Sequence, residues 1–442
     1  MPARGPLPDA ARGRDVLRVE HFGAIHYARR GATFEVFPPA FAALLEGATE
    51  RHIMDVWRDD PRGISLSELV GEVARLMDAG ILVEYRCPAR VVSDPQPASL
   101  SAPLVTNVQL TRACNLTCEH CFVEIDTQRH PRELSLEQLE SLFAELALAG
   151  APLVILAGGE PMTRPDFWPI VEAVERWDLD AALCTNATMI KEPQALRLAA
   201  TSLKWISVSL DGPDEAIHDA IRGRGSFVRA VRGIRTLVAA GAKGVKLRVT
   251  VTTPNAPYLA SFSKIATELA VPEIVFKPFR HGVGGSARTS THLYISRAEY
   301  LRAVERAQAE WPAEAPPATF DDGMPESLPA WTNVTPAFGC VGGTTHASVT
   351  FEGRIIACDA VFDDADWTFH ERGLIEAWRG SPTIRAWRHL EDGGSCRSCG
   401  NFERCGGGCR VRALSAGLTI HDPDPWAYCE TGPRSPLLRI FH

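Results

Sequence analysis

Three cysteines lie close together in the segment Cys114-Asn-Leu-Thr-Cys118-Glu-His-Cys121, which has CxxxCxxC spacing. The segment follows an apolar run, residues 104–110, that predicts a β-strand. Three neighbouring thiols cannot all pair as disulfides, because one is always left over. Iron–sulfur cubes are held by cysteine thiolates, and three thiolates on a four-iron cube leave one iron open to another molecule. The alternatives are a structural zinc site and reduced core cysteines.

A second set of cysteines lies near the C-terminus. Its first two cysteines, Cys340 and Cys358, lie on either side of Gly353. After a gap, the next four cysteines are separated by two, five and three residues. The set comprises Cys340, Cys358, Cys396, Cys399, Cys405, Cys409 and Cys429. The run from Cys396 to Cys409 alone has the donors for a zinc site, but seven cysteines divide poorly between tetrahedral sites. Three consecutive glycines, residues 406–408, permit the tight backbone needed around a metal cluster.

The composition limits the classes of protein that fit. A chain of 442 residues predicts two or three domains. A formal charge of −8 and a pI near 5.9 argue against a nucleic-acid partner held through its phosphates. No apolar run approaches the roughly 18 residues that cross a bilayer, and the N-terminus lacks an apolar signal core. We therefore expect a cytoplasmic protein with no membrane partner, whose twelve cysteines serve metal or redox chemistry.

Residues 104–290 alternate between apolar runs and amphipathic helical patterns. Strands are predicted at residues 104–110, 153–156, 181–184, 205–210, 246–251 and 273–276. A capping box at Ser135 begins one of the intervening helices, and Gly150 ends it. Continuous apolar strands joined by helices predict a parallel sheet covered on both faces. Six β/α units favour a partial barrel over a closed eight-stranded one.

In parallel barrels the chemistry takes place at the carboxyl ends of the strands. Here those ends carry glycines and polar side chains. After the cysteine segment they are Gly158, Gly159, Glu160, Asn186, Ser207, Ser209 and Asp211, with Arg222 a little further along the chain. The guanidinium of Arg222 has the charge and geometry to bind a carboxylate. Cys184 lies inside a predicted strand and is interpreted as a core residue.

The CxxxCxxC segment after the first strand resembles the signature of the radical SAM enzymes, in which the open iron binds the amino and carboxylate groups of S-adenosylmethionine. Gly158-Gly159-Glu160 resembles the GGE motif of that family, which implies contact with the methionyl ammonium. The other positions that the resemblance assigns to this cofactor are Asn186, Ser207, Ser209, Asp211, Arg222 and, through its backbone beside the adenine, His120. The implied fold is α/β, with a partial (β/α)6 radical SAM barrel over residues 104–290.

The C-terminal cysteines resemble the SPASM pattern, which holds two auxiliary [4Fe–4S] clusters and brings the implied total to three. The implied ligands are Cys396, Cys399, Cys405 and Cys429 for the outer cluster, and Cys340, Cys358 and Cys409 for the inner one. Some relatives have an eighth cysteine before the position of Cys340. Residues 330–339 contain none, which predicts an inner iron open to substrate, water or another ligand. Asp359 matches the position of a general base in sulfatase-maturing relatives.

Residues 1–92 predict a small winged-helix-like α+β domain. Strands are expected at residues 16–19, 23–28 and 33–37, followed by helices at 40–45 and 50–57 and by a helix with a capping box at Ser65. This order resembles the PqqD-like recognition elements, which accept a leader peptide as an added strand. A DNA-binding winged helix and a structural cap are the alternatives. The remaining boundaries are an extended, proline-rich linker at 93–103, a bridging region at 291–334 and a cysteine-rich SPASM domain at 335–442.

Two further segments resemble the peptide-modifying SPASM enzymes, especially the mycofactocin maturase and PqqE families: Asp211-Gly-Pro-Asp with Arg222-Gly223, and Arg164-Pro-Asp-Phe-Trp168. The resemblance implies a maturase that uses a 5′-deoxyadenosyl radical to oxidise a ribosomally synthesised precursor peptide by cross-linking, desaturation or decarboxylation. The implied partners are that peptide, with its leader on the N-terminal domain, and an electron-donating flavodoxin or ferredoxin. The alternatives are a protein substrate of the sulfatase-maturase type, a small-molecule substrate, and a zinc-bearing winged-helix regulator.

Overall fold

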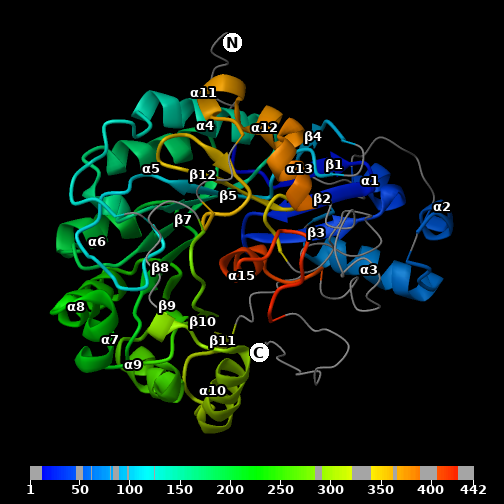
Figure 1. Cartoon of the computed structure of the whole chain (residues 1–442). Helices are drawn as coiled ribbons and strands as arrows, with labels where there is room; N and C mark the ends of the chain where they lie inside the picture. Colours follow the sequence, from blue (N-terminus) through cyan, green and yellow to red (C-terminus); the bar gives the residue numbers. More distant parts are fainter. Residues whose placement is uncertain are drawn as a thin grey trace.

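A computed structural model describes residues 12–45, 53–60, 62–79, 81–82, 89–96, 99–123, 125–283, 291–320, 340–361, 366–388 and 406–426. Within these ranges the strands form two sheets, one with nine strands and one with four. The larger sheet and its helices make up the body of the molecule, and the smaller sheet lies to one side with helices of its own (Figure 1).

Parallel strands alternate with helices at the centre of the larger sheet. The strands are β5 (Val105–Gln109), β6 (Leu153–Ala157), β7 (Asp180–Thr185), β8 (Trp205–Ser209), β9 (Val245–Val251) and β10 (Ile274–Pro278). The helices are α4 (Leu136–Leu148), α5 (Phe167–Arg176), α6 (Glu192–Ala199), α7 (Glu215–Arg222), α8 (Ser226–Ala239) and α9 (Phe262–Glu268), with 3-10 turns at Pro161–Thr163 and Ala256–Ser261. Each of the six strands predicted from the sequence is present, and the α/β class is confirmed.

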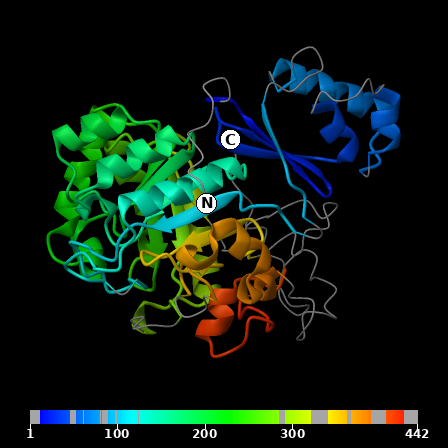
Figure 2. The ribbon, with the colours of Figure 1, turned by 90° about the horizontal axis from the view of Figure 1, so that it is seen from above.

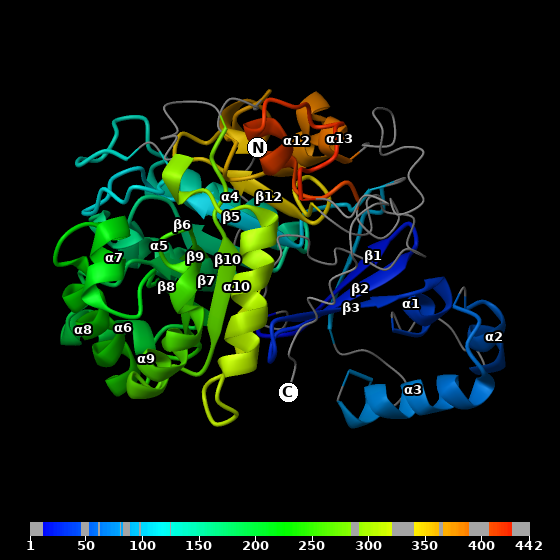
Figure 3. The same ribbon diagram turned by 60° about the horizontal axis from the view of Figure 1, so that its bottom comes forward.

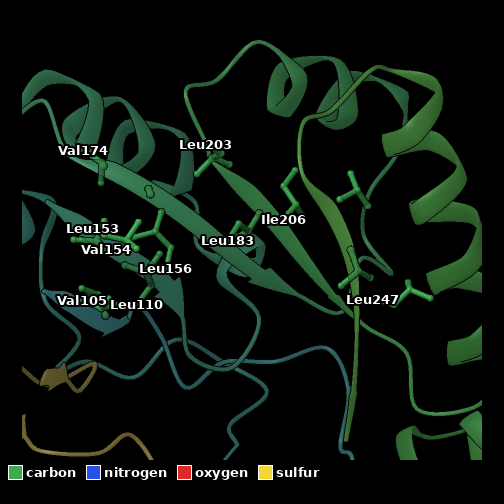
Figure 4. Packing of buried hydrophobic residues seen from close by; sticks show 14 of the residues in the cluster. Val105, Leu110, Leu153, Val154, Leu156, Val174, Leu183, Leu203, Ile206 and Leu247 are labelled. Atoms are coloured by element: carbon green, nitrogen blue, oxygen red, sulfur yellow. The ribbon is translucent and has the colours of Figure 1, made fainter. Parts of the chain in front are cut away.

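The main core forms where the apolar face of these strands packs against the helices (Figure 4). Helix α4 illustrates how the sequence builds this layer. Ser135 Oγ accepts a hydrogen bond from the Gln138 amide, and the Gln138 side chain accepts one from the Ser135 amide. Gly150 follows the helix with φ +71°, a left-handed conformation that favours glycine. The inward residues of the helix are Leu139, Leu142, Phe143, Leu146 and Ala147.

The larger sheet extends beyond the predicted strands at both edges. At one edge β11 (Ala318–Phe320) lies parallel to β10, after a 3-10 turn at Thr291–Leu293 and helix α10 (Arg297–Glu310). At the other edge β12 (His346–Val349) lies parallel to β5 and pairs antiparallel with β13 (Ile355–Ile356). Strands this short carry too little periodicity to be predicted. Part of the segment expected to form a separate C-terminal domain therefore belongs to the central sheet.

The four-stranded sheet has the order β3-β2-β1-β4. Its strands are β1 (Val16–Glu20), β2 (Gly23–Ala28), β3 (Thr33–Phe37) and β4 (Arg90–Ser93), and its helices are α1 (Pro39–Leu45), α2 (Ile53–Arg58) and α3 (Leu66–Asp78). Leu17 and Phe37 pack with these helices in a second core. Ile25 and Phe34, whose side chains alternate to the other face, pack against the main core. The sheet therefore lies between its own helices and the body of the molecule (Figures 2 and 3).

Polar contacts reinforce this placement of the small sheet. Tyr27 Oη donates a hydrogen bond to Asp180 Oδ2 at 2.7 Å, at the start of β7. The Arg29 guanidinium pairs with Asp178 at 2.8 Å and with Asp180 at 3.1 Å. The pKa of Tyr27 is raised far above its ordinary value, because the ring is buried and its hydroxyl faces the Asp180 carboxylate. These buried contacts join the two sheets into one body.

The described part of residues 93–103, which was predicted to be an extended linker, is packed against neighbouring segments. Ser93 ends β4, which pairs in parallel with β1. Leu100 and Ala102 are fully buried, and the Trp378 indole donates a hydrogen bond to Leu100 O at 2.8 Å. The prolines do keep the chain from forming a helix, but the apolar residues between them are covered by the C-terminal segment.

Short helices of the C-terminal segment lie against the body of the molecule. They are α11 (Phe369–Arg372), α12 (Leu374–Gly380), α13 (Pro382–Arg388) and α15 (Arg410–Ser415). The Glu145 carboxylate, near the end of α4, accepts hydrogen bonds from the amides of Leu374 and Ile375 and so anchors the start of α12. Among the described residues, no helix has the length and apolar character needed to cross a membrane.

Candidate active site

A cavity of about 300 Å³ opens where the central parallel strands end. Twelve of the site residues predicted from the sequence line this cavity. They are Cys114, Cys118, His120, Cys121, Gly158, Gly159, Asn186, Ser207, Ser209, Arg222, Cys358 and Asp359. The volume is in the range of small-molecule sites, and the position agrees with the rule for parallel barrels.

Hydrogen-bond donors from the cysteine loop and from neighbouring elements lie close to the sulfur atoms of this loop, which follows β5. The Leu116 amide donates to Cys114 Sγ at 3.4 Å, and Asn186 Nδ2 approaches the same sulfur at 3.9 Å. Arg222 Nη1 lies 3.9 Å from Cys118 Sγ. Burial raises the pKa of the Cys114 thiol to about 12 and also raises that of Cys118. The thiols are therefore neutral until a metal displaces their protons, and the surrounding donors would then stabilise the thiolates.

Gly158 and Gly159, at the end of β6, allow this loop to lie directly against the strand. A Cβ atom on Gly158 would be 2.3 Å from Thr111 O, and one on Gly159 would be 2.2 Å from Ala113 O. Both obstacles are backbone atoms that cannot move aside cheaply. The Gly159 amide donates to Thr111 O at 2.6 Å, and the Glu160 amide donates to Ala113 O at 2.8 Å. The glycines are thus required by the packing of the cysteine loop.

The Glu160 carboxylate, for which the resemblance implies a cofactor contact, is absent from the cavity lining and lies behind Thr185 and Asn186. The side chain is buried and accepts hydrogen bonds from Thr185 Oγ1 at 2.8 Å and from the Asn186 amide at 2.7 Å. Burial raises its pKa, and these hydrogen bonds oppose the rise. Glu160 therefore joins the ends of β6 and β7 and places Asn186, which does line the cavity.

Asp211 also lies behind the cavity wall and is completely buried. Its Oδ2 pairs with Arg222 Nε and, at 3.0 Å, with His120 Nε2, while its Oδ1 accepts from the Thr250 amide at 2.7 Å. Burial opposes ionisation of Asp211, but Arg222 and His120 outweigh it and hold the pKa of this carboxyl below its ordinary range. Asp211 is absent from the cavity lining, and the cofactor contact that the resemblance implies for it stays a prediction. Asp211 positions Arg222 and His120.

The second group of thiols forms at the opposite wall. Cys340, Cys358 and Cys409 share one small apolar cluster, to which Phe122 from the first cysteine loop also belongs. Burial raises the pKa values of Cys340 and Cys358, and the nearby Cys409 sulfur adds to the rise at both thiols. The Cys409 amide donates to Asp424 Oδ2 at 2.7 Å. The three cysteines that the sequence assigned to one inner cluster are therefore brought together from distant parts of the chain.

The glycines before Cys409 make the turn that carries it. Residues 406–408 all have positive φ, between 55° and 78°. A Cβ on Gly408 would be 2.4 Å from the Asp424 side chain. The predicted outer-cluster ligands, Cys396, Cys399, Cys405 and Cys429, lie outside the described residues.

Sequence reasoning missed several residues of this cavity. Cys184 was interpreted as a core residue, but its side chain faces the cavity. Other polar residues that line it and were not singled out are Asn107, Arg248, Thr250, Lys277 and Arg280. A signal was available, since Arg248 and Lys277 are charged residues that alternate with apolar residues along parallel strands. Such residues in a covered sheet must face either a partner or a hollow.

These features fit a cluster bound by three cysteines together with a nucleoside ligand. The donors are soft thiols that converge on one cavity, and the cavity has room beside them for a small molecule. His120 lines the cavity, and its Nδ1 is buried without a hydrogen-bond partner among the described residues. Within the same residues no three potential ligands have the spacing for a single metal ion, so the fit rests on donor chemistry and on the cavity.

The fold and the site define an α/β barrel enzyme with thiol ligands at the carboxyl ends of its strands. The model of the radical SAM superfamily matches residues 108–256. The mycofactocin maturase MftC of Mycobacterium tuberculosis is 31% identical over 344 residues, which are 77% of this chain and 86% of that protein. An AdoMet-dependent heme synthase of Oleidesulfovibrio alaskensis is 27% identical over 332 residues, covering 70% of this chain and 82% of that protein.

Solved structures agree on the fold. Streptococcus suis SuiB bound to S-adenosylmethionine aligns with a TM-score of 0.68 at 17% identity, over 96% of this chain and 100% of that one. SuiB bound to its precursor peptide SuiA aligns with a TM-score of 0.67 at 17% identity, over 93% and 97%. The chain belongs to the radical SAM superfamily. Membership implies a [4Fe–4S] cluster and S-adenosylmethionine as cofactors, for which the cavity supplies thiols and polar contacts.

Proposed function

We propose that this enzyme is a maturase that oxidises a ribosomally synthesised precursor peptide by radical chemistry. One observation carries the proposal: a single cavity joins the CxxxCxxC thiols at one wall to Cys358 and Asp359 at the other. A substrate between these walls meets a site for radical formation on one side and a site for electron removal on the other. A radical enzyme with no net oxidation to perform has no need of the second wall.

The likeness to known proteins supports a peptide as the substrate. MftC, which this chain matches over most of its length, is a maturase, and SuiB has been solved with its precursor peptide bound. The small N-terminal sheet supports the same substrate, because among the described strands β3 pairs with β2 alone and leaves an edge open. An extended peptide can add to such an edge by main-chain hydrogen bonds. The leader is therefore proposed to bind there.

The bound cofactors would supply a 5′-deoxyadenosyl radical able to take hydrogen from an unactivated carbon. The protein's own residues bind and orient. Cys114, Cys118 and Cys121 would hold the cluster, and Arg222, which is fixed by Asp211 and lies next to Cys118, would bind the carboxylate of the methionyl group. Ser207 and Ser209, from β8, line the cavity beside Arg222 and are proposed to contact the ribose.

Asp359 is proposed as the base that takes the proton released when the substrate is oxidised. Its carboxylate lines the cavity directly after Cys358, and the Cys358 thiol lies 3.6 Å from Asp359 Oδ1. Gln109 Nε2 donates to the Asp359 backbone carbonyl at 3.3 Å and so fixes this turn against β5. With Cys340, Cys358 and Cys409 as inner ligands and the predicted outer ligands completing a second auxiliary cluster, three clusters in all are proposed, reduced by a flavodoxin or ferredoxin.

The first experiment supplies anaerobically reconstituted enzyme with a reductant, S-adenosylmethionine and a short peptide encoded beside its gene. Mass spectrometry of the peptide and quantification of 5′-deoxyadenosine are the readouts. A loss of two hydrogens indicates a cross-link or desaturation, and a larger loss indicates decarboxylation. Formation of 5′-deoxyadenosine with an unchanged peptide would contradict this peptide as the substrate. It would favour the alternative hypothesis of a small-molecule substrate, as in the heme synthase relatives.

The role of the N-terminal sheet is tested with the peptide rather than by truncation. A cut at residue 92 would pass through β4 and uncover the face that carries Ile25 and Phe34, so loss of activity would have two explanations. Fluorescence anisotropy with labelled peptide avoids this problem. We expect the full precursor to bind at least tenfold more tightly than the core segment without its leader, roughly the value of a few main-chain hydrogen bonds. Equal affinities would contradict leader binding.

A further inference from the structure

The side of the cavity formed by β9 and β10 carries positive charge. Arg248 projects from β9 and Lys277 from β10, and both line the cavity. Thr250 is the register partner of Lys277, and Arg248 lies two residues before Thr250, so all three side chains point to the same face of the sheet. The two cations therefore enter the same hollow from neighbouring strands.

Cys184 marks the point where these charges meet. Burial raises the pKa of its thiol, while Arg248, which is within hydrogen-bond reach, and Lys277 both act in the opposite direction. The Asp359 carboxylate acts on the same thiol from the second wall. Arg248, Lys277 and Asp359 thus surround one region of the cavity, next to the second group of thiols.

Most of the charged side chains that line the cavity are cationic. The described lining residues include four cationic side chains, Arg222, Arg248, Lys277 and Arg280, and one carboxylate, Asp359. Asp211 pairs with Arg222 from behind the wall. Arg248 and Lys277 lie on the β9–β10 side, and cationic side chains that line a concave site favour an anionic ligand.

This anion is distinct from the carboxylate of S-adenosylmethionine. The residues assigned to that cofactor come from the loop after β5, from the ends of β6, β7 and β8, and from Arg222 of α7. Arg248 and Lys277 come from the next two strands. Beyond β10, the Val283 amide donates to Ala360 O at 2.8 Å, which joins this side of the cavity to the segment carrying Cys358 and Asp359. Arg248 and Lys277 thus lie in the part of the cavity that a substrate would occupy between the cofactor site and the second wall.

We propose that Arg248 and Lys277 form a carboxylate-binding subsite that orients the reacting residue of the substrate peptide. The carboxylate is either the C-terminus of the peptide or an acidic side chain beside the reacting residue. The Arg248 guanidinium can bind it through two parallel hydrogen bonds, and the Lys277 ammonium adds a point charge. The inference rests on the proposed peptide substrate and specifies the chemical group that the substrate must present.

The test compares reconstituted Arg248→Gln and Lys277→Gln enzymes with the wild type, using the precursor peptide encoded beside the gene. Two altered peptides accompany it: one with a C-terminal amide, and one with the core acidic residues changed to Gln or Asn. The readouts are KM and kcat for modification, anisotropy of labelled peptide, and the Kd of S-adenosylmethionine. Each variant is expected to raise KM and the peptide Kd about 10- to 100-fold, the value of a charged hydrogen bond. The peptide that lacks the recognised carboxylate should bind all three enzymes equally weakly.

Lys246→Gln is the matched control. Lys246 lies on β9, on the same face and two residues before Arg248, but it pairs with Glu273 at 3.6 Å and does not line the cavity. We expect its KM to stay within about twofold of the wild type. Arg248→Lys should recover part of the lost affinity, because it keeps the charge and loses only the paired hydrogen bonds. Iron content and circular dichroism identify any variant that does not fold. If Arg248→Gln does not fold, Arg248→Lys is compared with the wild type in its place.

Three outcomes overturn the inference. Weaker binding of S-adenosylmethionine with an unchanged peptide KM would assign the two cations to the cofactor. Variants indistinguishable from Lys246→Gln would remove any role in binding. The wild-type enzyme could instead cleave S-adenosylmethionine but neither bind nor modify the peptide. That result would contradict the proposed function, and it would also exclude this peptide as the ligand of the subsite. The affinity of the wild type thus separates the two failures.

Discussion

The two groups of thiols, of which the second reaches the cavity through Cys358, are built in different ways. Cys114, Cys118 and Cys121 lie on one short loop after β5, held by backbone hydrogen bonds and by the Arg222 guanidinium. Cys340, Cys358 and Cys409 come from segments up to 69 residues apart and meet in a small apolar cluster. The first group depends mainly on local geometry that a few neighbouring residues enforce. The second exists only once the C-terminal segment has packed against the central sheet.

The difference indicates how the two walls divide the work. The first wall has polar donors directed at its sulfurs and a buried ion pair behind them, as a site needs that binds a charged nucleoside cofactor beside a cluster. The thiols of the second group lie in an apolar cluster, and Asp359 is the carboxylate next to them that lines the cavity. Low polarity and limited solvent access influence the potential at which a cluster exchanges electrons. The predictions below test this division.

Cys114→Ala should have the largest effect. Removal of one of the three ligands from the first wall is expected to release about four iron atoms per chain and to abolish S-adenosylmethionine cleavage, because the proposed cluster depends on all three thiolates. Iron analysis and 5′-deoxyadenosine quantification measure this. Cys184→Ala is the control, since Cys184 lines the same cavity but is assigned to no cluster. Substantial cleavage by Cys114→Ala would refute the cofactor site.

Cys358→Ala should separate the functions of the two walls, which are S-adenosylmethionine cleavage and peptide oxidation. S-adenosylmethionine cleavage is expected to persist, while peptide oxidation falls by about 100-fold or more, because the second wall can no longer accept the electron. Asp359→Asn should also retain cleavage and lower oxidation, by about 10- to 1,000-fold for a lost general base. The ratio of deoxyadenosine to modified peptide is the measurement. If both products fell equally in Cys358→Ala, the walls would not be functionally separate.

Asp211→Asn should destabilise the first wall. The substitution leaves the buried Arg222 guanidinium without its partner charge, which typically costs about 3–5 kcal/mol. Chemical denaturation and the Kd of S-adenosylmethionine would both report it, since Arg222 and His120 lose their common anchor. Asp214→Ala is the control in the same segment, because it removes only the helix cap of α7 and costs about 1 kcal/mol. Equal losses in the two variants would contradict the role assigned to Asp211.

His218→Gln should have a smaller, pH-dependent effect. Burial and then the nearby Arg222 charge lower the pKa of His218 to about 4, and its Nδ1 accepts a hydrogen bond from the Asp211 amide at 3.2 Å. Because the folded pKa lies below the ordinary value of 6.5, the unfolded chain takes up the proton first as pH falls. Stability is therefore lost between about pH 6.5 and pH 4, and at pH 5 the loss is about 2 kcal/mol.

Denaturation curves at pH 7 and pH 5 measure this effect of His218. The variant should lose about 2 kcal/mol less than the wild type between the two values. His292→Gln, at an exposed site that pairs with Glu119, is the control and should follow the wild type. A variant with the same acid sensitivity as the wild type would exclude His218 as a source of that sensitivity.

Much of the central fold was predictable because each local signal agrees with the tertiary structure. The capping boxes at Ser135 and Ser65, and the six apolar runs, correspond to α4, α3 and the six central strands. The position of Gly158-Gly159 at a strand end beside the cysteine loop was likewise predictable, but their close packing against the backbone of that loop was seen only in the structure. The short strands β11 and β12 were not predictable, because their stability comes from neighbouring strands rather than from their own pattern.

The sequence by itself determined which residues have the types and spacing to bind metal clusters: the spacing of Cys114, Cys118 and Cys121 and the C-terminal cysteine pattern are properties of the chain before it folds. Only the tertiary structure decided which side chains face the cavity. It places Glu160 and Asp211 behind the cavity lining and turns Cys184, Arg248 and Lys277 toward the cavity. Spacing along a strand fixes the relative face of two side chains, but which face becomes the core and which the cavity depends on how the sheet curves and on what covers it.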